Sequence, residues 1–213
     1  MANFPRINQL IADLCEGDVL RQQRAKRSLM ALDDPEVLPA LVRRLDHPDM
    51  GVRLTLVSLI LQFDDTRAVP PLIELLEVDP EPGVRAAAAE ALGELGGDDS
   101  SASLEWALLH DPDSIVRAEA ANALGTIADV RSTETLIRAL GEKETEVWHA
   151  AGEALWQIGE DVMPRVIDAL IDRDHELRKA ALRAVLWLSI DADEEEPLPL
   201  DDLGWVETWG WWN

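Results

Sequence analysis

A repeat with a period of 30–32 residues constrains this sequence more than any other feature. The best-preserved copy reads DPDSIVRAEAANALGTIA, from residue 111 to residue 128. Its apolar residues recur at the spacing that places them on one face of an α-helix. An Asp-Pro-Asp sequence precedes them, where an aspartate can accept hydrogen bonds from free N–H groups and a proline is tolerated. The repeat therefore predicts an amphipathic helix that needs neighbouring copies to bury its apolar face.

Each repeat is marked by an acidic residue at the start of its second helix. These acids are Asp18, Asp49, Glu81, Asp113, Glu144 and Asp174, and the residues four positions later are Gln22, Arg53, Arg85, Arg117, Trp148 and Arg178. A shorter apolar segment precedes the acid, and Pro39, Pro71 and Pro164 mark its first turn in three of the repeats. No segment has the pattern of a strand. The sequence predicts an all-α fold, an α-solenoid of about six helix pairs over residues 1–190, followed by an acidic, Trp-rich tail over residues 191–213.

The arginine that stands four residues after the acid in four of the six repeats has two interpretations. Within one helix it would form an i,i+4 ion pair worth about 0.3–0.5 kcal/mol. Between stacked repeats it would meet the acid of the next repeat and fix the stacking distance. We expect this second arrangement, a structural ladder made by Asp49, Arg53, Glu81, Arg85, Asp113, Arg117, Asp174 and Arg178.

The charge balance narrows the classes of partner. Acidic residues number 42 and basic residues 19, which gives a net charge of −23 that disfavours nucleic acid and anionic membranes. The acidity suits basic partners or a saline milieu, or it serves solubility alone. Cys15 is the single cysteine, and no segment reads as a signal peptide or a membrane span. A cytoplasmic protein is expected.

Three segments carry a resemblance to a known family. They read PLIELLEVDP (71–80), VRAAAAEALGELG (84–96) and DPDSIVRAEAANALGTI (111–127). They resemble the bacterial HEAT-like repeat, including the subgroup found in phycobilin lyases, and the resemblance spans about residues 8–190. It implies a curved helical scaffold whose second helices line a concave face, and it does not by itself imply an enzyme.

The side chains expected on that face change in charge along the chain. Arg24 and Arg27, with Arg21 and Lys26 nearby, make the first repeat basic, and glutamates dominate the middle repeats. The row ends at Arg183 and Trp187. This gradient would orient a bound partner, or the first charges would simply cap the end of the solenoid.

All eight tryptophans lie between residues 106 and 212, and the first 105 residues have none. Trp106 aligns with apolar positions of other repeats, which predicts ordinary core packing. Trp148, Trp156 and Trp187 replace residues where repeats stack or face the groove. With His149 they would form a flat apolar surface for a peptide or a planar ligand, or they would receive the chain's own tail.

The tail begins with an acidic run and two prolines, which predict that the last helix ends near Ile190. Trp205, Trp209, Trp211 and Trp212 then follow within eight residues. Water disfavours so much exposed apolar surface, so the segment is expected either to fold back as a cap or to dock in another protein.

No catalytic, cofactor or metal constellation stands out in this sequence. The four histidines lie in different repeats, the acidic run at 191–196 lacks the spacing of a calcium loop, and no glycine-rich turn carries the lysine of a phosphate loop. The expected function is a non-catalytic scaffold that binds a protein partner through its concave face, its tail, or both, with no cofactor. The alternative is a bilin lyase or another tetrapyrrole-handling protein, which is also the one enzyme class considered. The candidate partner-binding residues are Trp148, His149, Trp156, Arg183, Trp187, Trp205, Trp209, Trp211 and Trp212.

Overall fold

The structure, a computed structural model, describes residues 4–189, with the side chains of residues 98 and 99 excepted. Over this range the chain forms twelve α-helices in six consecutive pairs, with three short 3-10 helices and no strand. The prediction of an all-α solenoid built from helix pairs is confirmed. The predicted tail, residues 191–213, lies outside the described residues.

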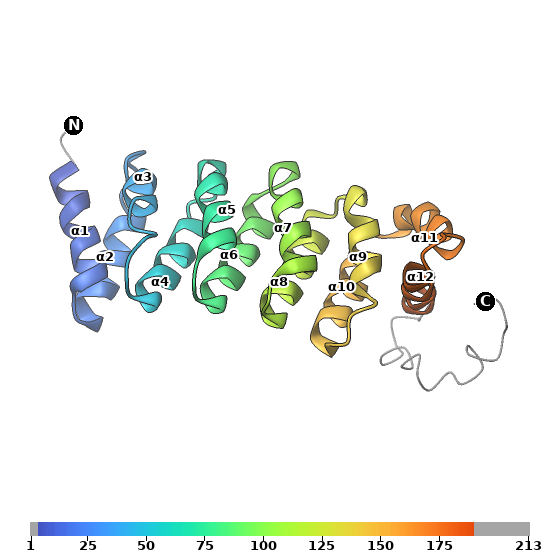
Figure 1. Cartoon of the computed structure of the whole chain (residues 1–213). Helices are drawn as coiled ribbons and strands as arrows, with labels where there is room; N and C mark the ends of the chain where they lie inside the picture. The colour runs from blue at the N-terminus through green and yellow to red at the C-terminus, as the bar shows by residue number, and fades with distance from the viewer. Residues whose placement is uncertain (1–3, 190–213) are drawn as a thin grey trace. The chain divides into compact units, whose positions relative to one another are not determined.

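The chain divides into two compact units, Met1–Ser103 and Leu104–Asn213, with the boundary inside helix α7. Figure 1 shows the helices of the first unit standing side by side in chain order. They are α1 (Phe4–Glu16), α2 (Val19–Met30), α3 (Val37–Val42), α4 (Met50–Leu61), η1 (Thr66–Ala68), α5 (Val69–Val78) and α6 (Pro82–Leu95). Their inward side chains form a dry core that includes Ile7, Leu29, Leu56, Leu72 and Leu92, all fully buried.

The second unit repeats the same plan after α7 (Asp98–His110). Its elements are α8 (Ser114–Ile127), η2 (Val130–Ser132), α9 (Thr133–Ala139), α10 (Thr145–Ile158), η3 (Glu160–Val162), α11 (Met163–Leu170) and α12 (His175–Leu188). The predicted inner positions of the best-preserved repeat are buried, since Val116, Ala120 and Leu124 are 0% exposed. In Figure 1, α12 is seen nearly along its axis, whereas α8 and α9 are seen from the side.

Small residues set the close approach of α8 and α10. A Cβ added at Gly125 would lie 2.8 Å from Cα of Ala154, so α10 approaches α8 too closely here for a side chain at position 125. Helices that touch through small residues can stack with little space between them. This contact explains why glycine stands at position 125 and alanine at position 154.

Candidate functional site

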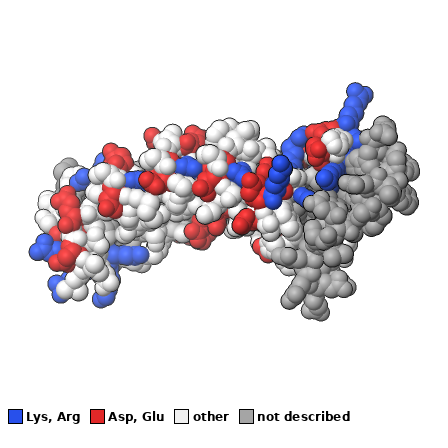
Figure 2. All heavy atoms as spheres, turned by 60° about the horizontal axis from the view of Figure 1, so that its bottom comes forward, with Lys and Arg blue, Asp and Glu red and all other residues white. Residues whose placement is uncertain are grey.

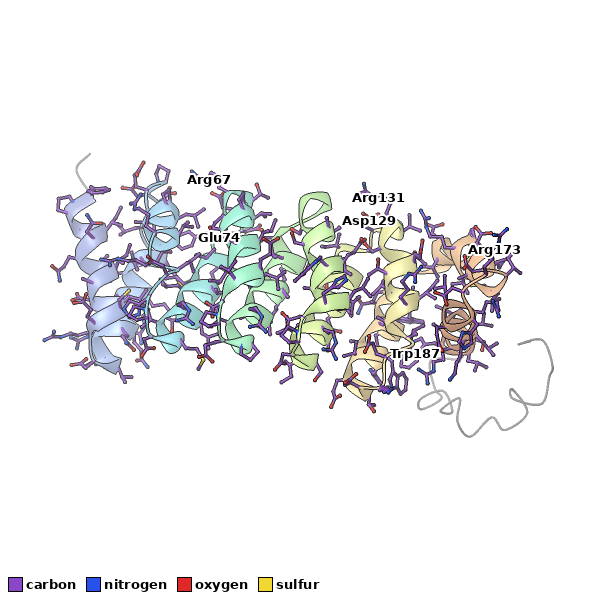
Figure 3. The ribbon with its side chains drawn as sticks, in the orientation of Figure 1. Arg67, Glu74, Asp129, Arg131, Arg173 and Trp187 are labelled. Atoms are coloured by element: carbon purple, nitrogen blue, oxygen red, sulfur yellow. The ribbon has the colours of Figure 1, made fainter. Side chains whose placement is uncertain are left out.

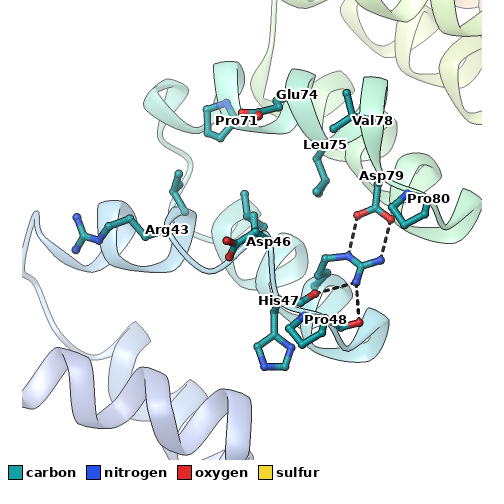
Figure 4. Close-up of a pocket in the computed structure, with 13 residues that line it drawn as sticks. Arg43, Asp46, His47, Pro48, Pro71, Glu74, Leu75, Val78, Asp79 and Pro80 are labelled. Atoms are coloured by element: carbon teal, nitrogen blue, oxygen red, sulfur yellow. Dashed lines mark hydrogen bonds and ion pairs between the residues drawn. The ribbon is translucent and has the colours of Figure 1, made fainter.

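Arg53 of α4 is the best-defined ladder arginine. Its Nε and Nη2 donate to the two carboxylate oxygens of Asp79 at 2.7 and 2.8 Å, and its Nη1 donates to the carbonyls of His47 and Pro48 at 2.8 and 3.2 Å (Figure 4). Both side chains of the pair are almost completely buried, at 7% and 3% exposure. The hydrogen bond to Asp79 raises the pKa of Arg53 above its usual range. The guanidinium therefore ties its own turn to the turn of the next repeat.

The acid that pairs with Arg53 differs from the one that the alignment of the repeats with one another suggested. Arg53 pairs with Asp79, two residues before the aligned Glu81, because Asp79 lies in the Asp-Pro turn that packs against α4. The aligned acids instead begin helices: Asp49, Asp113 and Asp174 each accept a hydrogen bond from a backbone N–H of the first turn. These acids act as helix N-caps.

The other ladder arginines also return to their own turns. Nη1 of Arg85 donates to the carbonyl of Asp79 at 3.0 Å, and Nη1 of Arg178 donates to the carbonyl of Asp172 at 2.8 Å. Arg117 donates to the carbonyl of Asp111 at 2.8 Å and lies 3.4 Å from the carboxylate of Glu144 in the next repeat. The repeated arginine thus serves to hold turns together in each unit.

A second repeated ion pair lies before the first helices of two repeats. Asp65 precedes η1 and pairs with Arg67 inside it, at 2.6 Å. Asp129 precedes η2 and pairs in the same way with Arg131, at 2.7 Å (Figure 3). Hydrogen bonds from the arginines lower the pKa values of both aspartates. The same aspartates accept a backbone N–H, so each pair fixes a turn.

Trp148, His149 and Trp187 come together where α10 meets α12. The ring of Trp187 lies edge-on to Trp148 at 5.8 Å and to His149 at 5.1 Å, with an interplanar angle of 82° in both cases. Figure 3 shows Trp187 beside α10. Trp148 stands in the position that an arginine takes in four of the other five repeats. An aromatic cluster, defined here as Trp148, His149 and Trp187, therefore replaces the arginine contact between the last two repeats.

Gly152 lies directly under the aromatic cluster. A Cβ at this position would lie 2.5 Å from Cδ2 of Trp187, so the indole rests on the bare backbone of α10. His149 also lines a hollow of about 400 Å³ between α8 and α10, together with residues that include Asn122, Glu146 and Glu153. Trp187 of the cluster therefore packs on the helix, and His149 of the cluster borders a hollow with both polar and apolar lining residues.

Two other tryptophans are exposed. Trp156 is 59% exposed, so it does not join the aromatic cluster. The prediction that Trp106 packs in the core is wrong, since it is 54% exposed and stacks on His110 with ring centroids 5.3 Å apart. Leu104 and Leu108 of the same helix fill the core instead. The aligned Ile167 is also 54% exposed, so alignment with apolar residues did not imply burial.

The remaining sequence candidates have different positions. Arg183 is half-buried and donates from Nη1 to the carbonyl of Leu140, which ties α12 to the end of α9. Trp205, Trp209, Trp211 and Trp212 lie outside the described residues.

Charge is unevenly distributed over the first unit. Helix α2 carries four basic residues and no acidic residue. Figure 2 shows basic side chains projecting at the N-terminal end, on the left. Glu90 and Glu94 of α6 are exposed, as the sequence predicted for residues of the second helices.

A groove between α3 and α5 was not predicted from the sequence. It encloses about 580 Å³ and is lined by apolar side chains such as Leu45, Leu75 and Val78, with Arg43 and Glu74 among the charged residues at its edge (Figure 4). Helix α3 ends after six residues, and residues of the segment 43–48 that follows it line one side of the groove. No sequence motif marks this groove.

The residues that the structure describes were also compared with the requirements of a metal site, a membrane span and a reactive thiol. Within residues 4–189 no three His, Cys, Asp or Glu side chains gather as metal ligands would. None of the described helices combines the length and the apolar character that crossing a bilayer requires. Burial raises the pKa of the Cys15 thiol, which disfavours the nucleophilic thiolate.

Comparison with known proteins agrees with the arrangement of consecutive helix pairs. Residues 44–125 and 101–187 match the family described as HEAT repeats, which is more than half of the chain. The chain belongs to the HEAT repeat family. The two matched ranges together cover the helix pairs from α4 into α12.

Two proteins similar to this HEAT repeat chain are connected with bilins. The bilin biosynthesis protein PecE of Mastigocladus laminosus is 38% identical over 80 residues, a match that covers 37% of this chain and 29% of PecE. The chain thus spans less than a third of that relative. A chain in the complex of CpcE and CpcF of phycocyanin lyase from Nostoc sp. PCC7120 is 26% identical, with a TM-score of 0.54 over 75% of this chain and 68% of that one.

A third similarity concerns the fold alone. An engineered protein is 22% identical, with a TM-score of 0.52 over 86% of this chain and 96% of its own. The similarity shows that the arrangement of helix pairs is common to proteins of different origin.

Proposed function

We propose that this HEAT repeat chain is a protein-binding module that uses the exposed side of its second helices. The proposal rests on one observation: some polar side chains of these helices join successive turns, and others are exposed to solvent. The arginines Arg53 and Arg117 are engaged in joining turns, whereas Glu90, Glu94 and Asn122 are exposed and lie away from the buried core. Exposed polar residues on rigid helices provide a surface for a partner without loss of stability.

The complex of CpcE and CpcF gives further support, because a structurally similar chain acts there together with another protein. The high negative charge of the chain, −23, favours a partner with a basic surface. Attraction of this kind mainly raises the rate of association and the specificity of the complex.

The test compares three forms of the full chain as baits in a lysate of the source cells. Glu90→Lys with Glu94→Lys reverses charge on α6, and the control, Glu74→Lys with Glu77→Lys, makes the same change on exposed positions of α5. A protein retained in stoichiometric amount by the wild type and the control, and lost by the α6 variant, supports the proposal. Equal retention by all three forms would count against a role for the α6 surface.

A second candidate function is the handling of a bilin, favoured by the likeness to PecE and CpcE and by the aromatic cluster. A linear tetrapyrrole is flat and apolar with polar side groups, and Trp187 beside the hollow at His149 offers matching chemistry. Addition of a linear tetrapyrrole should shift its absorption spectrum, and Trp187→Ala should reduce the shift. Trp106→Ala serves as the control. An unchanged spectrum with the wild type would exclude this candidate.

A further inference from the structure

Helix α2 differs from the rest of this acidic chain in its charge. Its sequence VLRQQRAKRSLM contains Arg21, Arg24, Lys26 and Arg27 and no acidic residue. Arg21 lies 4.0 Å from the carboxylate of Asp18. Within the described residues 4–189, Arg24, Lys26 and Arg27 make no ion pair or hydrogen bond through their side chains. A cluster of three unpaired cations is unexpected in a chain with a net charge of −23.

Apolar residues accompany these cations on the outer side of α2. Ala25 and Leu29 face the core, at 1% and 0% exposure. Val19, Leu20 and Met30 are exposed to 71%, 57% and 48%. In helical register Leu20, Arg24 and Arg27 form one stripe, and Val19, Gln23, Lys26 and Met30 form the adjacent stripe. The outer face of α2 thus carries cations in its middle and apolar side chains at both ends.

The outer face of α2 combines two properties that solubility alone does not explain. Exposed aliphatic side chains do not make a protein more soluble. If α2 served only to cap the end of the solenoid, its three exposed apolar side chains would not point toward water. Positive charge flanked by apolar groups suits a ligand that is acidic and apolar together. A purely acidic ligand would leave Val19, Leu20 and Met30 in contact with water.

The same chain contains a segment with this complementary composition. Residues 191–212 hold eight acidic residues, no basic residue, three leucines and four tryptophans. They lie outside the described residues, and only their sequence enters the argument. The acidic residues concentrate in 191–202, and the tryptophans follow at 205–212. A segment of this kind can pair its charges with a basic helix and also shield its apolar side chains from water.

We propose that the outer face of α2 is the binding site for residues 191–212 of this chain. The acidic run pairs with Arg24, Lys26 and Arg27, and the leucines and tryptophans cover Val19, Leu20 and Met30. The site is the same whether the segment comes from the same molecule or from a second copy. Helix α2 is itself a second helix, but this proposal concerns a different ligand from the protein partner proposed above. It is tested by crosslinks from α2, whereas the protein-binding function is tested by the charge change on α6, so either proposal can fail without the other.

The test uses the full chain with a photo-crosslinking amino acid in place of Gln23, which is exposed among the cations of α2. Irradiation followed by mass spectrometry should identify crosslinks to residues 191–212. A matched protein with the crosslinker in place of Ser58, an exposed residue of α4, should give at least tenfold fewer crosslinks to this segment. A mixture of ¹⁴N- and ¹⁵N-labelled protein distinguishes crosslinks within one molecule from those between two, and either result supports the site.

Charge variants complete the experiment. Arg24→Glu with Arg27→Glu should reduce the crosslink yield at least tenfold, and 1 M salt should reduce it because the Debye length falls to about 3 Å. The control, Arg165→Glu with Arg173→Glu, makes the same charge change on exposed residues of the second unit and should retain the yield. Circular dichroism verifies that every variant is folded. Crosslinks from Gln23 to other segments only, or an equal loss in both charge variants, would overturn the proposal.

Discussion

Replacement of Arg53 by methionine is expected to destabilise the first unit strongly. The substitution removes both contacts with Asp79, at 2.7 and 2.8 Å, and leaves a carboxylate that is 3% exposed without its counter-charge. The loss of one partner of a buried ion pair typically costs about 3–5 kcal/mol. The carbonyls of His47 and Pro48 also lose a donor, which places the expected cost in the upper part of that range.

The measurement is urea unfolding of the full chain, followed by circular dichroism and by hydrogen exchange of peptides from residues 37–95. Tryptophan fluorescence is unsuitable for this unit, since residues 1–103 contain no tryptophan. With a slope of about 1–3 kcal/mol per M urea, the midpoint should fall by more than about 1 M. Arg21→Met, which removes an exposed arginine of the same unit, should cost about 0.5 kcal/mol or less.

A double-mutant cycle separates the ion pair from other effects of each substitution. Asp79→Leu should cost about as much as Arg53→Met, because it leaves the guanidinium buried without its partner. The double variant should cost less than the two single variants together, with a coupling of about 1–3 kcal/mol. Additivity within about 0.5 kcal/mol would show that the two side chains do not depend on each other and would refute the reasoning.

Three further predictions concern other parts of the structure. Gly152→Ala should lower the stability by about 1–3 kcal/mol, because the new methyl group would overlap the ring of Trp187, whereas Gly83→Ala adds a methyl group to open space and should raise the melting temperature. Because the pKa of Asp129 is lowered from its ordinary value of 3.8, its ion pair stabilises the protein above that value and is lost as the pH falls; Asp129→Asn should therefore flatten the stability profile between about pH 5 and pH 2. Trp106→Ala should change the free energy of unfolding by less than about 0.5 kcal/mol, and a loss of several kcal/mol would contradict its exposed position.

The period of the repeat was sufficient to predict much of the fold. Helical spacing identified Val116, Ala120 and Leu124 as core residues, and all three are fully buried. Asp49, Asp113 and Asp174 were correctly located at the starts of second helices. These predictions succeeded because they depend on local backbone geometry, which a short segment largely determines.

Contacts between repeats were harder to predict. The partner of Arg53 is Asp79, and its choice depends on where the next turn lies when two helix pairs stack. The exposure of Trp106 likewise depends on how α7 is rotated against its neighbours, which the apolar residues at aligned positions did not reveal. Successive side chains of a helix point in different directions, so a position one residue away from a buried one can be exposed.

The sequence by itself determined the helix pairs, their number, their caps and the family resemblance, because a helix period and its end signals are local properties. Only the tertiary structure decided that Trp148, His149 and Trp187 form one cluster over Gly152, and that a groove lies beside the short α3. It also decided that three of the four cations of α2 lie unpaired among residues 4–189. The physical reason is that each of these features joins residues from different elements or depends on which neighbours a side chain meets. Such contacts are set by the packing of whole helices.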